Sequence, residues 1–376
     1  MRGRRLGTLL AMGVLVALVA LALSACSGGQ AANKKSAGGG SDVTNGQVAF
    51  RRWFDPDQTK GALFTMNPDG SHVRQITHPP KDWPRDDSPA RSPDGERIAF
   101  HRQTSDGGLT RIMVVSPDTG DAREITSCTG RCVSNFDPAF SPDSDSIAFN
   151  RQIGPPFLKG VPRPIDWSKI SYPDWKNYSA IFIVGLDGSD PPQQVTETPK
   201  RREGQMATAV EQASFSPDGK MLTFVRTNFQ KENDRFAVFV QPIGSPEDAH
   251  RITPWNLNCQ DHPEFSTDGK LVLFRCLPEG EEGPSNLYWV HPDGTGLHAL
   301  THEDADKQYL GSSFSPSFSG GEGWITVGRT AGYGDEGNAD VFRVRIEGGD
   351  VVRSENLTKS AIWDSAPVWG SHPPVG

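Results

Sequence analysis

The sequence lacks the short motifs that mark the commonest enzyme classes. Its 376 residues contain no Gly-x-Ser-x-Gly nucleophile elbow, no Gly-x-x-x-x-Gly-Lys-Ser/Thr phosphate loop, no His-Glu-x-x-His and no Cys-x-x-Cys-His. Positive charge is scarce as well, because 38 Lys and Arg stand against 46 Asp and Glu, for a formal net charge of −8. Nucleic acid is therefore not an expected partner, since its phosphates are bound by basic surfaces. An enzyme whose site is assembled from distant segments is not excluded by these absences.

Cysteine is also rare, with five residues in the whole chain, and the paired Cys-x-x-Cys spacing of a zinc site is missing. Cys128 and Cys132 bracket a short loop. Cys259 and Cys276 flank a predicted hairpin with its turn at 266–270, which brings them nearly opposite each other. In an exported protein these spacings predict two disulfides, and the alternative is four reduced, buried thiols.

Long apolar runs are missing except at the N-terminus. Three Arg residues precede the apolar run 9–23, which has the length of a signal-peptide core and is short for a membrane span. A Leu-Ser-Ala-Cys segment ending at Cys26 follows and resembles the lipobox of bacterial lipoproteins. The resemblance implies a signal peptide over 1–25 and a lipidated Cys26 as the first mature residue. An ordinary secretory signal is the alternative.

Residues 26–45 are mostly Gly, Ser, Ala and Lys, a composition that predicts a flexible tether. Without the three signal-peptide Arg the net charge changes from −8 to −11 (−8 − 3), so electrostatic adhesion to anionic lipid is not expected. The acyl group would therefore be the anchor. The expected location is the extracytoplasmic side of the cell membrane.

A short phrase recurs at nearly fixed intervals after the tether. Its full form is Ser-Pro-Asp-Gly, and its copies begin at Ser92, Ser141, Ser216, Ser266 and Ser315, in steps of 49, 75, 50 and 49 residues. Pro presets the backbone for a turn, and Gly supplies the positive φ that closes it. Apolar segments of strand length flank each turn, and four of them fit into one period. A period of about 40 to 50 residues made of strands is typical of propeller blades.

These repeats resemble the TolB-like and WD-like propeller family over residues 46–370. The fold expected from the repeats is all-β. The second strand occurs six times, which predicts a six-bladed β-propeller of four-stranded antiparallel blades. The chain opens with a second strand at Gln47 and ends with a first strand at 366–369. We therefore expect the C-terminal strand to pair with the N-terminal blade and close the ring, which removes an open sheet edge. Residues 371–376 are expected to be a tail.

The largest insertion in the repeats covers residues 152–179 and accounts for the 75-residue step. It is rich in proline, and its aromatic residues include Trp167, Tyr172, Trp175 and Tyr178. Aromatic rings provide flat apolar surface with polar edges. One interpretation is a lid or a binding ledge for a carbohydrate or a protein. The other is a flap that buries its own rings on neighbouring blades.

Two charged sets also recur. One is an Arg two residues after the apolar centre of each second strand, and the other is an acidic residue just before the first strand. The members are Arg52, Arg102, Arg151, Arg226 and Arg329, with Cys276 in the fifth unit, and Asp87, Asp137, Glu211, Asp261 and Asp364. One interpretation is a structural lattice of charge-assisted hydrogen bonds. The other is an acidic channel mouth that binds a cation such as Ca²⁺. No further cofactor is expected, and the identity of any metal stays open.

Loop lengths divide the predicted propeller into two faces. The Ser-Pro-Asp-Gly turns and the other hairpin turns of one face are short, while nearly all long connections lie on the other face. Binding residues concentrate on loops that a rigid scaffold displays. The sequence therefore predicts a monomeric, non-catalytic binding module that presents its long-loop face to a protein or glycan of the cell envelope. The alternative is an extracytoplasmic propeller enzyme, of polysaccharide lyase or hydrolase type, with its site at the channel mouth.

Overall fold

The computed structural model describes residues 45–105, 109–154, 178–197, 208–228, 235–277, 285–302, 308–330 and 338–375. They all lie in the compact unit Val43–Gly376, which is separate from the unit Met1–Asp42. They form β-strands, turns and two short 3-10 helices, η3 (Pro246–Asp248) and η4 (Trp255–Leu257). No helix among them is long and apolar enough for a membrane crossing. The prediction of an all-β fold is confirmed.

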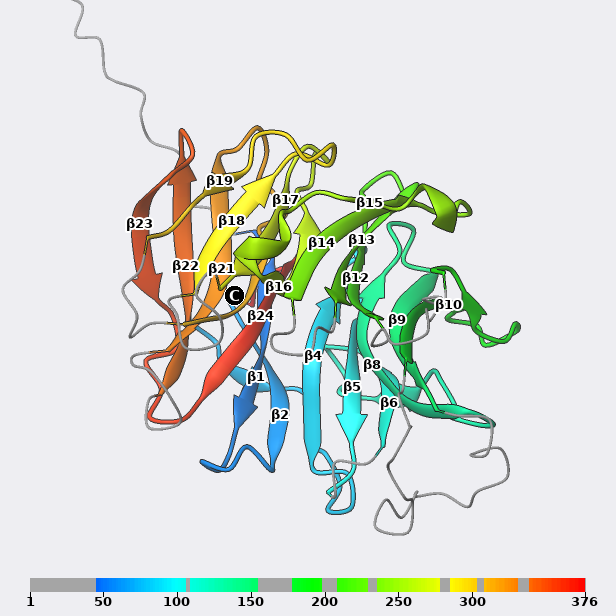
Figure 1. Ribbon diagram of the computed structural model, residues 1–376. Helices are drawn as coiled ribbons and strands as arrows, with labels where there is room; N and C mark the ends of the chain where they lie inside the picture. The colour runs from blue at the N-terminus through cyan, green and yellow to red at the C-terminus, as the bar shows by residue number, and fades with distance from the viewer. Residues whose placement is uncertain are drawn as a thin grey trace, which may run out of the picture. The chain divides into compact units, whose positions relative to one another are not determined.

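The strands form antiparallel sets of four, which follow one another along the chain (Figure 1). The first set contains β24 (Asp364–Gly370), β1 (Gln47–Trp53), β2 (Gly61–Met66) and β3 (Arg74–Gln75). The second contains β4 (Arg85–Arg91), β5 (Ile98–Gln103), β6 (Thr110–Val115) and β7 (Ala122–Glu124). A single parallel pair, Gly61 with Arg85, joins these two sets into one eight-stranded sheet.

The remaining sets have the same order and stay separate sheets. The third contains β8 (Cys132–Phe140), β9 (Ser146–Ile153), β10 (Tyr178–Gly185) and β11 (Gln193–Gln194). The fourth contains β12 (Thr208–Phe215), β13 (Met221–Asn228), β14 (Arg235–Pro242) and β15 (His250–Arg251). The fifth contains β16 (Cys259–Phe265), β17 (Val272–Cys276), β18 (Asn286–Val290) and β19 (His298–Ala299). The sixth contains β20 (Tyr309–Phe314), β21 (Gly323–Thr330), β22 (Ala339–Glu347) and β23 (Asp350–Asn356).

The first strand of each set is an inner strand that contacts its counterparts in the neighbouring sets. The contacts run from β24 to β4, β8, β12, β16 and β20 in turn, and β20 contacts β24 again. Apolar cores lie between neighbouring sets, and the second strands contribute the fully buried rings of Phe50, Phe100, Phe149, Phe224 and Phe274. Burial of one such ring stabilises a fold by about 1.5–3 kcal/mol, so these cores fix the spacing of the sheets.

The Ser-Pro-Asp-Gly phrase forms the turn between first and second strands. In the first copy the Ser92 hydroxyl donates to the Asp94 carboxylate at 2.5 Å and accepts the Arg97 N–H at 2.9 Å. Gly95 has a φ of 79°, and its N–H donates to the Ser92 carbonyl at 2.9 Å. The copies at Ser141, Ser216 and Ser266 keep the hydroxyl-to-carboxylate bond. Side chains therefore satisfy polar groups that the turn leaves outside the strand ladder.

A threonine closes the outer edge of every set. Each hydroxyl accepts a backbone N–H of the third strand of its set, at a position beyond the end of the fourth strand. The pairs are Thr77 with Leu63, Thr126 with Ile112, Thr196 with Ile181, Thr253 with Val238, Thr301 with Leu287 and Thr358 with Val341. The recurring threonine thus replaces a backbone acceptor for a buried N–H group.

The last strand pairs with the first, as the sequence predicts. β24 runs antiparallel to β1, with Gln47 opposite Gly370 and Ala49 opposite Val368. Figure 1 shows β24 and β1 side by side, although they come from opposite ends of the colour scale. The indole of Trp369 is buried and donates to the Asn45 carbonyl at 3.2 Å. Beyond the strand, the Pro373 carbonyl accepts the Gln47 side-chain N–H at 2.7 Å, so the start of the predicted tail is bound.

Both predicted disulfides are present. Cys128 joins Cys132, with 5.1 Å between their Cα atoms. Cys259 joins Cys276 across the β16–β17 pair, with 3.9 Å between their Cα atoms, and both residues are fully buried.

Removal of residues 364–376 is expected to unfold the whole described unit rather than its end alone. The deletion takes away the partner of β1 and exposes the contacts of Trp369, whose burial alone is worth about 3–5 kcal/mol. Thermal unfolding followed by circular dichroism tests this, with deletion of residues 375–376 as the control. A truncated protein that melts like the intact one would contradict the stabilising role of the β24–β1 pairing.

The double variant Cys259→Ala/Cys276→Ala is expected to lose about 3 kcal/mol of unfolding free energy, and Cys128→Ala/Cys132→Ala about 2 kcal/mol. The difference follows from loop length, because the longer loop constrains the unfolded chain more. Chemical denaturation under non-reducing conditions measures both. Equal or reversed losses would show that loop closure is not the main contribution.

Candidate functional site

Each inner strand is interrupted by a β-bulge at an equivalent position of the repeat. The bulge contains a residue in the left-handed region: Ser88 (φ 49°), Asp137 (50°), Gln212 (58°), Asp261 (77°), Gly311 (82°) and Ala366 (49°). The strand pairing shifts register at these places. β16 has one residue more than the others, His262, also with positive φ (47°). Such conformations are uncommon outside glycine and collect at functional sites.

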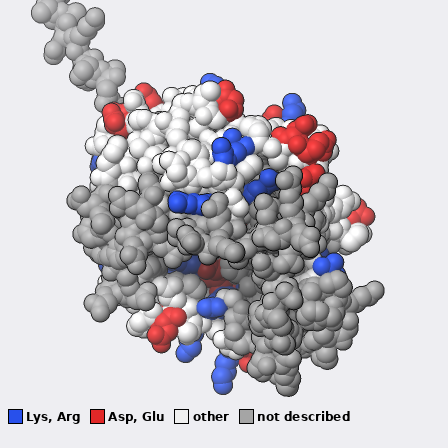
Figure 2. Space-filling model, viewed as in Figure 1, with Lys and Arg blue, Asp and Glu red and all other residues white. Residues whose placement is uncertain are grey.

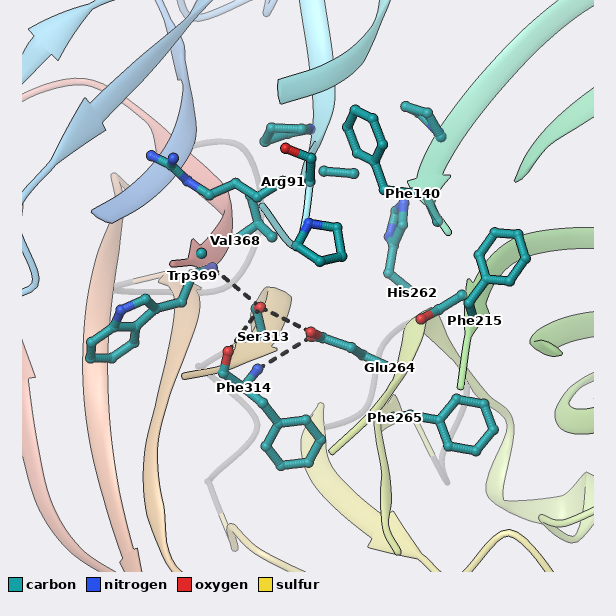
Figure 3. Close-up of a pocket in the computed structure, with 18 of the residues that line it drawn as sticks. Arg91, Phe140, Phe215, His262, Glu264, Phe265, Ser313, Phe314, Val368 and Trp369 are labelled. Carbon is teal, nitrogen blue, oxygen red and sulfur yellow. Dashed lines mark hydrogen bonds between the residues drawn. The ribbon is translucent and has the colours of Figure 1, made fainter. Parts of the chain in front are cut away.

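A cavity of about 440 Å³ lies among the inner strands, from the bulges towards the Ser-Pro-Asp-Gly turns. All six inner strands line it, and Figure 3 shows their side chains around it. Most of the lining is apolar and includes Phe140, Phe215, Phe265, Phe314 and several prolines. His262 and Glu264 are the ionisable groups that β16 contributes. Ligand pockets have this size and this predominance of apolar lining.

Charged groups at the bulges are paired with one another. The Arg51 guanidinium forms a salt bridge with Asp87 and donates to the Ser365 hydroxyl at 2.5 Å. The Arg275 guanidinium lies 3.2 Å from Asp261. Asp261 also accepts the Gly311 N–H at 2.9 Å, which ties β16 to β20.

Asp137 is the centre of a second group. Its carboxylate lies 3.3 Å from the Nε2 atom of His262 and accepts hydrogen bonds from the Ser88 hydroxyl at 2.8 Å and the Asn150 amide at 3.2 Å. The Nδ1 atom of His262 lies 3.3 Å from Asp261. Burial opposes the charged imidazole, but these two carboxylates outweigh it and raise the pKa of His262 to about 10. His262 is therefore a cation at neutral pH.

The recurring Arg residues share an aromatic neighbour rather than an acidic one. Their guanidiniums lie over phenylalanine rings at 4.1–5.1 Å: Arg52 over Phe64, Arg151 over Phe182, Arg226 over Phe239 and Arg329 over Phe342. Arg102 lies over Phe100 at 5.4 Å. Arg52 also pairs with Asp364 at 2.7 Å, and Arg102 pairs with Asp86 at 2.6 Å. Cation–π contact is the property that every member keeps.

The predicted acidic set does not lie in equivalent positions. Asp364 and Asp86 correspond, because they stand opposite Arg52 and Arg102 in the strand pairs. Asp87 lies one residue further on and pairs with Arg51 of β1, whereas Arg102 pairs with Asp86. Glu211 accepts the Ser179 hydroxyl at 3.1 Å, and burial raises its pKa. Acids that recur in the sequence therefore lie in three different environments: opposite an Arg of the second strand, paired with an Arg of another set, or hydrogen-bonded to a serine.

Other predicted site residues are not tested by the structure. Trp167, Tyr172 and Trp175 lie outside the described residues, and of Tyr178 only the backbone pairing with Ile153 is described. In the part of the chain that the structure describes, no group of three or more His, Cys, Asp or Glu side chains is arranged around a possible metal position. The Ca²⁺ hypothesis for the acidic set stays a prediction.

Sequence reasoning favoured the long-loop face and missed the cavity towards the short turns. Glu264 and Ser313 were not singled out, although Figure 3 shows them facing each other across the β16–β20 junction. The available signal was a departure from the repeat. Only β16 places a carboxyl at the position that Ala90 and Ala139 occupy in β4 and β8.

The chain matches no family model, and no curated protein matches it. Solved structures do resemble it. TolB from Acinetobacter baumannii has a TM-score of 0.57 and 19% identity, covering 86% of this chain, which spans 66% of that protein. Putative TolB from Agrobacterium tumefaciens has a TM-score of 0.52 and 17% identity, covering 87% of this chain and 91% of that protein. Kuenenia stuttgartiensis hydrazine synthase has a TM-score of 0.59 and 13% identity, covering 88% of this chain and 48% of that one. At these identities the likeness establishes the fold, a TolB-like β-propeller.

Stability is expected to fall as pH rises from about 7 to about 10, and His262→Gln should flatten this fall. A group with a raised pKa binds its proton more tightly in the folded state. Its stabilising contribution is complete below the ordinary pKa of 6.5 and is lost as pH passes about 10. The effect is moderated by water, because the side chain is 39% exposed.

Melting temperatures at pH 6.5, 8 and 9.5 test this, with His250→Gln on the outer strand β15 as the control. Asp137→Asn should flatten the curve in the same way, because it removes the carboxylate that holds the proton on His262. A pH curve unchanged by both His262→Gln and Asp137→Asn would show that the pair does not hold a proton in the folded state.

Proposed function

We propose that this protein is an extracytoplasmic, lipid-anchored binding module: a closed, six-bladed β-propeller that receives part of a protein of the cell envelope in its central cavity. The observation that carries the proposal is the cavity itself, about 440 Å³ in volume and lined by all six inner strands. Its largely apolar lining fits an apolar segment of a polypeptide better than a glycan, whose hydroxyl groups need polar partners.

Ring closure is supported by two independent contacts. The inner strands contact one another in cyclic order, from β24 through β4, β8, β12, β16 and β20 back to β24. β24 also completes the antiparallel set that begins with β1. A ring explains why one cavity receives residues from every inner strand, since in an open arc the end strands would lie apart.

A binding role is favoured over catalysis by the state of the charged groups. Asp87, Asp261 and Asp137 each lie within salt-bridge distance of a cationic side chain, and the pKa of each carboxyl is lowered despite burial. Carboxylates held in this way are stable ion-pair partners and poor proton acceptors at neutral pH. Their arrangement suits a scaffold that fixes the bulges around the cavity.

The second candidate is an enzyme with His262 and Asp137 at the inner end of the cavity. The specific observation in its favour is a histidine between two carboxylates, at 3.3 Å from each, beside a cavity. The enzyme hydrazine synthase has a similar fold. Catalysis predicts that Asp137→Asn abolishes turnover of a substrate while the protein stays folded, whereas a binding module has no turnover to lose.

The anchor and the location rest on the N-terminal sequence. The lipobox ending at Cys26 supports a lipidated N-terminus, and the Gly- and Ser-rich residues 27–45 support a tether that holds the propeller away from the membrane. The two disulfides agree with an oxidising compartment outside the cytoplasm.

Affinity capture from a cell-envelope extract, with the form that starts at Ser27 as bait, tests the proposed function. Ser214 lies in the cavity lining, so Ser214→Trp fills the space and is expected to weaken capture of the specific partner at least about tenfold, or 1.4 kcal/mol. The matched control is Ser354→Trp, the same substitution on the exposed outer strand β23.

Equal capture by Ser214→Trp and Ser354→Trp, with both variants folded, would show that the partner does not use the cavity. Thermal melting of both variants establishes that they are folded. Loss of capture by Ser214→Trp alone supports the cavity as the binding site.

A further inference from the structure

We propose that Glu264 selects the ligand of the central cavity and binds a positively charged group, an amine or guanidinium, carried on an apolar body. The inference rests on the proposed function in one respect, the use of the cavity as a binding site. It adds the chemical class of the group that enters and the residue that recognises it.

Glu264 stands where the fold does not require a carboxyl. Opposite the equivalent second-strand residues Ala99, Ala148, Thr223, Thr326 and Ala49, the inner strands have Ala90, Ala139, Ser214, Ser313 and Val368. In β16 the corresponding pair is Glu264 with Leu273. Five of six sets therefore build the same junction with a small or apolar side chain. The same strand carries the additional bulge residue His262, so β16 departs from the repeat twice, each time with an ionisable group beside the cavity.

The carboxyl of Glu264 is only partly satisfied. It accepts the Ser313 hydroxyl at 3.3 Å and the Phe314 N–H at 3.2 Å, as Figure 3 shows. Two carboxylate oxygens offer about four acceptor sites, so these two long bonds leave capacity for a ligand. Among the side chains that the structure describes, none forms a salt bridge with Glu264. Burial raises the pKa of Glu264 to about 7, as expected for an acid whose charge lacks a close partner.

The other charged groups of the lining offset the burial of Glu264 only in part, because the positive charge of His262 lowers the pKa of Glu264 without reversing the rise that burial causes. His262 on the same strand shares its charge between Asp137 and Asp261. Arg91 on β4 extends away from Glu264, on the side of the cavity that Trp369 lines (Figure 3), and its nearest described acceptor is Gln47 at 3.4 Å. The lining residues of β8, β12, β20 and β24 bring no titratable side chain to the cavity.

These features define the ligand. A carboxylate in an apolar cavity is stabilised by a cation that also supplies hydrogen-bond donors, which an ammonium or guanidinium group does. Metal ions such as Ca²⁺ take six or more oxygen ligands, whereas the described lining offers one carboxylate. The apolar walls beyond Glu264 fit an alkyl or aromatic body. A neutral ligand of the same shape lacks the attraction between opposite charges, and an anionic ligand is repelled.

The test compares two small probes of equal shape, n-hexylammonium and n-hexanol, by titration calorimetry or NMR with the purified full-length protein at pH 8. n-Hexylammonium is expected to bind at least about tenfold more tightly, the ratio for one charge-assisted hydrogen bond. Glu264→Gln should abolish the preference. The control Glu347→Gln, which removes the same charge from the exposed end of β22, should retain it.

A wild-type protein that binds both probes equally, or a Glu264→Gln variant that keeps the preference, would overturn the inference. If Glu264→Gln does not fold, wild-type protein at pH 5.5 replaces it, because protonation of Glu264 must also abolish the preference. Suppose that the probe preference depends on Glu264 but Ser214→Trp does not change partner capture. This result would contradict the proposed function and still support the cation site. Capture that needs the cavity, with a preference indifferent to Glu264, would sink only the cation site.

Discussion

The antiparallel pairing of β24 with β1 is the constraint on which the described structure depends. Each set of strands buries one flank against the preceding set and one against the next, so a set at the end of an open row would expose an apolar flank. Here the last strand of the chain completes the first set, and Val48 and Trp369, which face each other in this pair, both lie in its core. Local strand order alone does not explain this pairing, because its partners are more than 300 residues apart. The entropic cost of closing such a loop grows only slowly with loop length. Buried contacts of this kind can therefore offset that cost.

The bulges turn this scaffold into a site. Without them the inner strands would carry regular alternating side chains towards the centre. With them, each strand changes register once. Asp137 contacts Ser88 of the preceding set and His262 of the fifth set, and Asp261 accepts the Gly311 N–H of the sixth. The resulting ion pairs lie at the inner end of the cavity, where mutual attraction compensates the cost of burial. The cavity beyond them stays apolar, with Glu264 as its partly satisfied carboxyl.

The repeat made much of the fold predictable from sequence. Ser-Pro-Asp-Gly turns, buried second-strand Phe residues and the two disulfides depend on local chemistry or on simple spacing, and the structure contains all of them. The environment of each acid was not predictable in the same way. Asp86 and Asp87 are neighbours in sequence, yet one pairs with Arg102 of the next strand and the other with Arg51 of another set. A one-residue bulge decides between them, and no residue type marks its position. Glu264 was not predicted because the sequence analysis relied on residues that recur in every unit. Glu264 is informative because it departs from the repeat.

The two ends of the described unit lie close together, which would allow its chain to be circularly permuted. The Asn45 carbonyl accepts the Trp369 indole N–H, and the Gln47 side chain donates to the Pro373 carbonyl. A short peptide could join these ends and new termini could be opened at another hairpin, giving a circular permutant with every strand neighbour unchanged. Because β20 contacts β24 and β24 contacts β4, new termini at another hairpin would leave these contacts in place. Such permutants place a fluorophore or an affinity tag at chosen positions around the rim while the cavity stays intact.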